Sequence, residues 1–295
     1  MNRVSRSQRA VSGALVWVVL GAAIVFFVLP VLWLLLAPTK TENQLVAGSA
    51  LSFGSFDDLA LAWNNLIEFQ NAAILLWLKN SAIYSVAGLL ITVAASIPAG
   101  YALAMTRFAG RKLLLTITLI VMLVPGTALV LPIYLELSAI GLVNSIWSVI
   151  LPSAFFPFGV YLTYIYFSTS VPPNLLDAAR IDGCDEWQIF ARIALPLAKP
   201  IIALVVFFSF IANWNNYFLP VVMLNRSADY PVQVGLQQLV ASTPAFAPMA
   251  GGDALNIGRP ELALAVLISV VPVLIIFLVS QRSLVSGLTA GATKE

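Results

Sequence analysis

Long apolar runs separated by short polar segments make up almost the whole chain. The first run, residues 11–36, is longer than the roughly 20 residues that a helix needs to cross a bilayer. Five further runs of comparable length follow it. The pattern predicts an all-α, polytopic membrane protein with six transmembrane helices, at about residues 11–36, 81–105, 113–135, 146–167, 200–223 and 262–280.

The composition agrees with this interpretation and removes several functions. The chain of 295 residues is 60% hydrophobic and 9% charged, whereas soluble domains carry about 25% charged residues. A net charge of +2 and no basic patch argue against nucleic acid as a partner. There is no histidine and one cysteine, Cys184. We therefore expect no catalytic residue and no metal site, and we find no glycine-rich phosphate-binding motif.

The basic residues indicate the orientation of the six helices. Residues 1–10 carry Arg3, Arg6 and Arg9, and a tail of residues 281–295 follows the last helix. If both ends lie in the cytoplasm, eleven of the fifteen lysines and arginines fall on that side, as the positive-inside rule requires. We predict a cytoplasmic (inner) membrane protein with both termini cytoplasmic. The more polar piece Leu59–Leu78 is then a helix outside the membrane, and residues 224–260 form an outer loop.

One polar segment, residues 171–196, interrupts the apolar sequence and is called the polar loop. Its first half predicts a short helix with Leu175, Ala178 and Ala179 on one face, and with Asp177 and Arg180 spaced to pair. Gly183 can adopt the left-handed backbone conformation that commonly ends a helix. Asp185 and Gln188 then form a capping-box pattern, and the second helix has to end before Pro196.

The polar loop resembles the "EAA" loop of bacterial ABC importer permeases. The match is Asp177-Ala178-Ala179-Arg180-Ile181-Asp182-Gly183, closing at Ile193-Ala194-Leu195-Pro196. It departs from the pattern at Asp177, where glutamate is usual. A surface-lying amphipathic linker is the alternative interpretation of these residues.

Three further stretches resemble the carbohydrate-uptake, maltose-transporter-type permeases of that family. They are the Asn-Trp-Asn-aromatic sequence at residues 213–220, the segment 230–236, and the tail at 281–292, which departs at Ser283 and Ser286. The resemblance implies a type I ABC importer permease fold. It also implies a second homologous permease subunit, a cytoplasmic ATPase dimer that binds ATP and Mg²⁺, an extracytoplasmic solute-binding protein and a sugar substrate. This chain would bind no cofactor itself.

The resemblance also assigns the candidate residues. The polar loop becomes a coupling helix that contacts the ATPase through Leu175, Asp177, Ala178, Ala179, Arg180, Asp182, Gly183, Trp187 and Phe190. For the sugar pathway, Asn213, Asn216 and Tyr217 share one face of the fifth helix (i, i+3, i+4), and Asn80 opens the second. Hydrogen bonding between helices explains these side chains equally well, and better for Asn80.

A self-sufficient secondary carrier or channel for a small polar solute is the alternative function. Ion-coupled carriers usually place acidic residues within the bilayer, and the predicted helices hold none away from their edges. A membrane-embedded enzyme is a third option, but a chain with no histidine has few groups for catalysis. The sequence therefore favours a permease that is energised by a separate ATPase.

Overall fold

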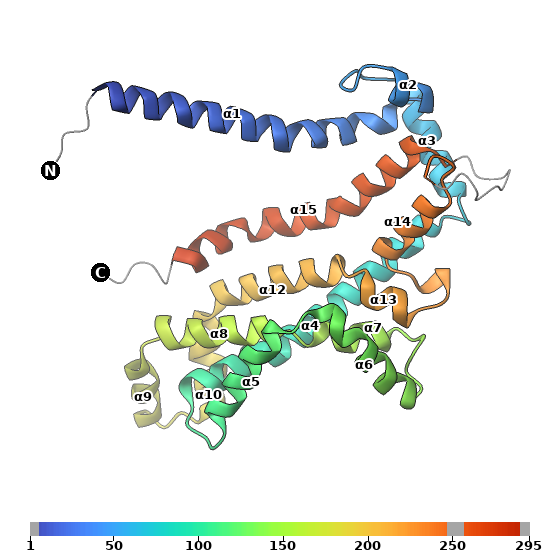
Figure 1. The fold of residues 1–295 in the computed structure, drawn as a ribbon. Helices are drawn as coiled ribbons and strands as arrows, with labels where there is room; N and C mark the ends of the chain where they lie inside the picture. Colours follow the sequence, from blue (N-terminus) through green and yellow to red (C-terminus); the bar gives the residue numbers. More distant parts are fainter. Residues whose placement is uncertain (1–5, 247–256, 290–295) are drawn as a thin grey trace. The chain divides into compact units, whose positions relative to one another are not determined.

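The computed structural model describes residues 6–246 and 257–289, and every regular element within these residues is helical (Figure 1). The chain divides into two compact units, residues 1–72 with 236–268 and residues 73–235 with 269–295. Arg3, the glycine-rich stretch 251–253 and the end of the tail at 290–295 lie outside the described residues.

The first unit begins with the apolar helix α1 and continues with short helices. Lys40 is buried, and its Nζ donates to the carbonyls of Ser49 and Ala50 at 2.8 and 3.0 Å. Glu261 is also buried and accepts from the Asn65 amide at 2.8 Å. These two charged side chains stabilise a compact polar end of the unit. Its elements are α1 (Arg6–Leu36), η1 (Ala37–Thr39), α2 (Glu42–Ala47), α3 (Phe56–Glu68) and residues 259–268 of α15 (Arg259–Thr289).

The second unit is built around the long helix α4 (Ala73–Met105), which lies beside α8 and α12 (Figure 1). The side of α4 that packs on neighbouring helices carries small residues, including Gly88, Thr92 and Gly100. Small side chains allow helices to approach closely within a membrane. The other helices are α5 (Arg111–Leu123), α6 (Gly126–Ala139), α7 (Trp147–Ala154), α8 (Pro157–Ser170), α9 (Pro173–Ile181), α10 (Glu186–Ile189), η2 (Phe190–Ala194), α11 (Leu195–Leu197), α12 (Lys199–Trp214), α13 (Phe218–Met223), η3 (Ser227–Asp229) and α14 (Val232–Ala241), which enters the first unit at residue 236.

The prediction of a single helix outside the membrane over Leu59–Leu78 is wrong. The structure ends α3 at Glu68 and begins α4 at Ala73. Between them Gln70, Asn71 and Ala72 have φ of 46°, 55° and 63°, and left-handed residues cannot continue a right-handed helix. Residues 73–78 therefore belong to the second membrane helix, which starts earlier than predicted.

Three of the predicted membrane helices are broken. Residues 113–135 fall into α5 and α6, which meet at 107°. Residues 146–167 break between α7 and α8, and residues 200–223 break between α12 and α13. Pro125 and Pro157 explain the first two breaks, because proline lacks the N–H that a helix needs and restricts the residue before it.

Among the described residues, four helical segments are long and apolar enough to cross a membrane. The number rises to six if each of two bent helix pairs counts as one span. One pair is α5 with α6, and the other is residues 186–197 with α12, bent by 75°. The six-helix prediction is thus compatible with the fold, although the helices are less regular than the hydropathy pattern indicates.

Candidate functional site

The polar loop folds through local rules that its sequence carries. α9 ends in a Schellman motif: the Cys184 N–H donates to the Ala179 carbonyl at 3.0 Å and the Gly183 N–H donates to the Arg180 carbonyl at 3.1 Å. Gly183 has a φ of 85°, which favours glycine. The predicted capping box is confirmed, because the Gln188 N–H donates to Asp185 Oδ1 at 2.8 Å. Helix, turn and helix therefore follow as predicted.

Arg180 joins the two helices of the polar loop. Its Nη1 donates to Asp177 Oδ1 at 2.7 Å, as its spacing predicts. Its Nε also donates to Glu186 Oε1 at 2.7 Å, and its Nη2 to Glu186 Oε2 at 3.3 Å. The hydrogen bonds to these two carboxylates, that to Glu186 first, raise the pKa of the guanidinium. The arrangement links the two helices across the turn, and the single positive charge of Arg180 offsets one of the loop's four negative charges.

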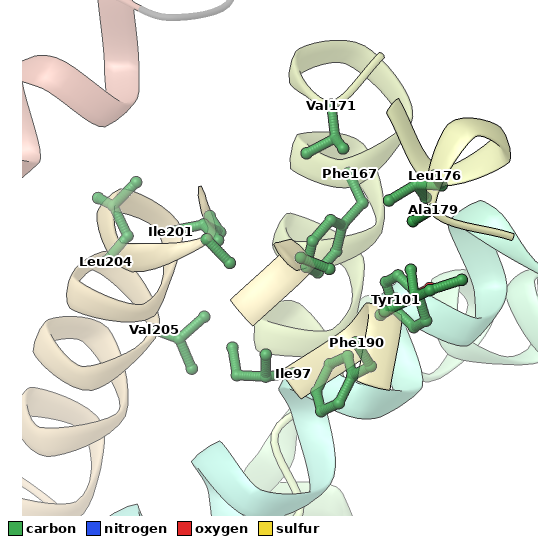
Figure 2. Packing of buried hydrophobic residues seen from close by; sticks show 13 residues of the cluster. Ile97, Tyr101, Phe167, Val171, Leu176, Ala179, Phe190, Ile201, Leu204 and Val205 are labelled. Atoms are coloured by element: carbon green, nitrogen blue, oxygen red, sulfur yellow. The ribbon is translucent and has the colours of Figure 1, made fainter. Parts of the chain in front are cut away.

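The inner face of the polar loop packs on the membrane helices (Figure 2). Leu176, Ala179 and Phe190 are buried there, and Phe190 lies 5.0 Å from the ring of Tyr101 on α4. The side chains of Ala179 and Phe190, predicted to contact another protein, pack instead into the core beneath the loop. This core also includes Phe167 and Val171 from the end of α8, and Ile201, Leu204 and Val205 from α12 (Figure 2).

The outer face of the polar loop exposes large apolar side chains. Ile181 is 86% exposed, Trp187 71% and Leu175 44%. Ala178 and Asp182 are exposed beside them. Apolar groups of this size on a charged loop are typical of a surface that another protein covers.

The second helix of the polar loop does not end before Pro196. A π-helical turn at Phe190–Ala194 carries the chain through this proline into α11, with the Leu195 N–H bonded to the Phe190 carbonyl. In a regular α-helix the proline ring would meet the carbonyl four residues earlier. The wider turn avoids that clash, and wide turns of this kind are frequent at functional sites.

A second feature lies where the membrane helices break. A cavity of about 640 Å³ is lined by Val124, by Phe155 and Phe156, and by Asn216, so that all three breaks contribute to it. Non-helical backbone at membrane depth is tolerated where it is buried in protein or lines a water-filled cavity. The lining is apolar and aromatic, with polar groups at Thr127, Ser153 and Asn216. None of the described lining residues is charged.

The structure separates the four predicted pathway residues. Asn213, Asn216 and Tyr217 do not share a helix face, because α12 ends at Trp214. Asn216 lines the cavity, and its amide donates to Ser153 Oγ at 3.3 Å. The Nδ2 of Asn213 is buried and finds no hydrogen-bond partner within the described residues.

Asn80 and Tyr217 have other surroundings. The amide of Asn80 donates to the carbonyls of Ala228 and Tyr230 at 2.8 and 3.1 Å. It thereby fixes the segment after α13 to α4, which is the structural role favoured from the sequence. Tyr217 is 39% exposed and is absent from the cavity lining.

Sequence reasoning missed the residues that the breaks bring together, namely Phe155, Phe156 and Ser153, and it missed Tyr101 beneath the polar loop. Pro125 and Pro157 were the available signal for the breaks. No local pattern marks Tyr101, because its neighbours in the fold are far from it in the sequence.

Comparison with known proteins identifies the family. Residues 96–289 match the binding-protein-dependent transport system inner membrane component family. The chain is 32% identical, over 97% of its length and 99% of the relative's, to the arabinooligosaccharides transport system permease protein AraQ of Halalkalibacterium halodurans. It is 30% identical to the diacetylchitobiose uptake system permease protein NgcG of Streptomyces coelicolor, over 90% of this chain and 84% of that one.

A solved structure shares the fold. A chain of a bacterial ABC transporter that imports the acidic polysaccharide alginate superposes with a TM-score of 0.80 at 22% identity, covering 96% of this chain and 99% of that one. Both features described above, the polar loop and all the lining residues of the cavity, fall within the matched residues 96–289. The chain therefore belongs to the family of inner membrane components of binding-protein-dependent transport systems, the permeases of ABC importers.

Proposed function

We propose that this chain is the permease subunit through which an ABC importer moves a saccharide across the inner membrane by alternating access. The observation that carries the proposal is the polar loop, a folded knob whose two helices are joined by Arg180 and which presents Leu175, Ile181 and Trp187. Such a surface can seat in a cleft of an ATPase and receive its motion. The names of the relatives support a saccharide as the substrate.

ATP and Mg²⁺ would bind to the partner ATPase, because this sequence has no phosphate-binding motif of its own. In this scheme the polar loop and both termini lie in the cytoplasm, which agrees with the distribution of basic residues. Exposed Asp182 adds a charge for the partner, while Asp177 is paired with Arg180 within the loop. Gly183 contributes through the turn rather than through a contact.

The saccharide pathway would run past the cavity at the helix breaks. Its volume falls in the range of small-ligand sites. Aromatic rings at Phe155, Phe156 and Phe158 suit the apolar faces of sugar rings, and Asn216 and Ser153 can exchange their mutual hydrogen bond for sugar hydroxyls. Broken helices beside the cavity provide the joints that alternating access requires.

A second permease subunit would complete the pathway. Phe155 is 70% exposed although it lines the cavity, and the second permease would cover this side. Large apolar side chains of α1, such as Trp17 and Phe26, are also exposed and would face lipid or the second permease. An extracytoplasmic solute-binding protein would deliver the substrate, as the family description indicates.

Affinity purification from native membranes in mild detergent, followed by mass spectrometry, tests the proposal. We expect a second permease and an ATPase to accompany the chain. Trp187→Ser should lose the ATPase but keep the second permease, whereas Trp63→Ser, a change at another exposed tryptophan, should keep both. If the chain purifies alone and transports a solute without ATP, the secondary carrier or channel is the correct interpretation.

A further inference from the structure

A continuous series of aromatic rings connects the exposed face of the polar loop with two membrane helices. Trp187 lies 5.7 Å from Phe190 between ring centroids, and Phe190 lies 5.0 Å from Tyr101. Tyr101 on α4 lies 5.3 Å from Phe167 on α8. These separations are typical of rings in direct contact. A displacement of Trp187 by a bound protein would thus be passed to α4 and α8 through packed groups.

Tyr101 is the unusual member of this series. Its side chain is 5% exposed, and its hydroxyl has no hydrogen-bond partner among the described residues. Leaving a buried hydroxyl unpaired is unfavourable, and a phenylalanine would supply the same ring without that cost. An acceptor for this hydroxyl in another state of the protein would remove that cost.

Glu186 is the candidate acceptor for this hydroxyl, because it lies four residues before Phe190, whose ring packs on Tyr101. Both oxygens of Glu186 are held by Arg180 in this structure. The side chain of Glu186 is 56% exposed, and exposed ion pairs contribute little to stability. This pair can therefore open when the polar loop shifts.

We propose that Tyr101 is a positioning residue for coupling: its ring ties α4 to the polar loop, and its hydroxyl donates to the Glu186 carboxylate in the state that follows ATP binding. In that state Arg180 keeps Asp177 and gives up one or both oxygens of Glu186. The inference rests on the proposed function, since it assumes that the polar loop receives motion from an ATPase. It adds the residue through which that motion reaches α4.

Tyr101→Phe tests the hydroxyl while retaining the ring. The measurement is saccharide transported per ATP hydrolysed, in liposomes that contain the complete complex. We expect this ratio to fall on the order of tenfold, because one hydrogen bond to a charged group is lost in one state only. Assembly and thermal stability should be unchanged or improved, since an unpaired buried hydroxyl is removed. Tyr164→Phe, the same change on α8, is the control and should leave the ratio unaltered.

A double-mutant cycle tests whether the hydroxyl acts through Glu186. Glu186→Gln should lower the same ratio, and adding Tyr101→Phe should then change it less than twofold. Full additivity would overturn the assignment of Glu186, and an unchanged ratio in Tyr101→Phe alone would overturn the role of Tyr101. If the wild-type complex forms but hydrolyses ATP without moving a saccharide, the proposed function fails, and the inference fails with it. If no ATPase assembles with the wild-type chain, the purification alone already shows that the proposed function and the inference both fail.

Discussion

Gly183 shows how a single residue decides the shape of the polar loop. A Cβ at this position would meet nothing within 4 Å, so substitution is not limited by space. It is limited by φ, which at 85° disfavours other residues by roughly 1–2 kcal/mol. The strain, rather than a clash, would reorient Asp185, Trp187 and the rest of the second helix.

Gly183→Val should therefore abolish ATP-driven transport while the protein still inserts into the membrane, because a β-branched residue tolerates left-handed backbone least. Gly183→Asn is the matched control, since asparagine adopts this conformation more readily, and it should retain most transport. The measurement is saccharide uptake normalised to membrane-inserted protein. Equal uptake by the two variants would contradict the conformational explanation.

The turn between α3 and α4 stores strain of the same kind. Gln70, Asn71 and Ala72 have positive φ in succession, and none is glycine. Ala72→Gly should raise the free energy of unfolding by about 1 kcal/mol, because glycine adopts a φ of 63° without a steric cost. Thermal unfolding of the purified protein in detergent measures the change.

Ala94→Gly, at an exposed position within α4, is the control substitution for Ala72→Gly. Glycine in the middle of a helix lowers stability, so the two glycine substitutions should move the melting temperature in opposite directions. A lower melting temperature for Ala72→Gly would mean that the three residues are not held in this conformation.

At the scale of elements, the close approach of α4 to α8 depends on Gly100. A Cβ on Gly100 would lie 2.4 Å from the Cβ of Thr163 and 2.9 Å from the backbone nitrogen of Tyr164. The neighbour includes backbone, so the helices would have to separate. Gly100→Ala should lower the free energy of unfolding by about 1–3 kcal/mol, as for other overpacked sites.

Gly21→Ala on α1 is the matched control for this prediction, because nothing lies within 4 Å of a Cβ there. It should leave stability unchanged or raise it slightly. Thermal unfolding of both variants under identical detergent conditions measures the difference, and Gly100→Ala should have the lower melting temperature. Equal melting temperatures would show that α4 and α8 do not pack as closely as the structure has them.

The elements also show which features could be predicted from the sequence. The polar loop was predictable because its signals are local: Gly183 stops one helix, and Asp185 with Gln188 caps the next. The breaks in the membrane helices were harder to predict, because hydropathy stays high across Phe155 and Phe156 whether or not the backbone is helical. A proline at residue 125 is compatible with a slight kink in a continuous helix and also with the observed bend of 107°.

Assigning the buried face of the polar loop needed information that the sequence does not contain. In a helix as short as α9, Leu175 with Ala178 and Leu176 with Ala179 are equally acceptable apolar pairs. The choice is made by Tyr101, far away in the sequence, whose ring packs with Phe190 beneath the loop. Long-range packing therefore decides which of the candidate residues are exposed.

At the scale of the whole molecule, a saccharide pathway has to combine polar groups with helices that can move. Asn216 and Ser153 meet at the cavity only because α7 and α12 both end there. The described lining holds no charged residue of the kind that ion-coupled carriers use, and its amide and hydroxyl groups can bond to a neutral solute. In the proposed function the energy for transport arrives through the polar loop.

Filling the cavity tests this pathway directly. Thr127 lines the cavity, and Thr127→Trp should reduce saccharide flux on the order of tenfold, because an indole would project into the cavity and narrow the space left for a saccharide. Thr116→Trp places the same bulk on the exposed surface of α5, outside the cavity, and should leave flux unchanged. ATP hydrolysis by the assembled complex should persist in both variants, since neither change touches the polar loop. Normal flux through Thr127→Trp would place the pathway elsewhere and leave the cavity as a packing feature of the broken helices.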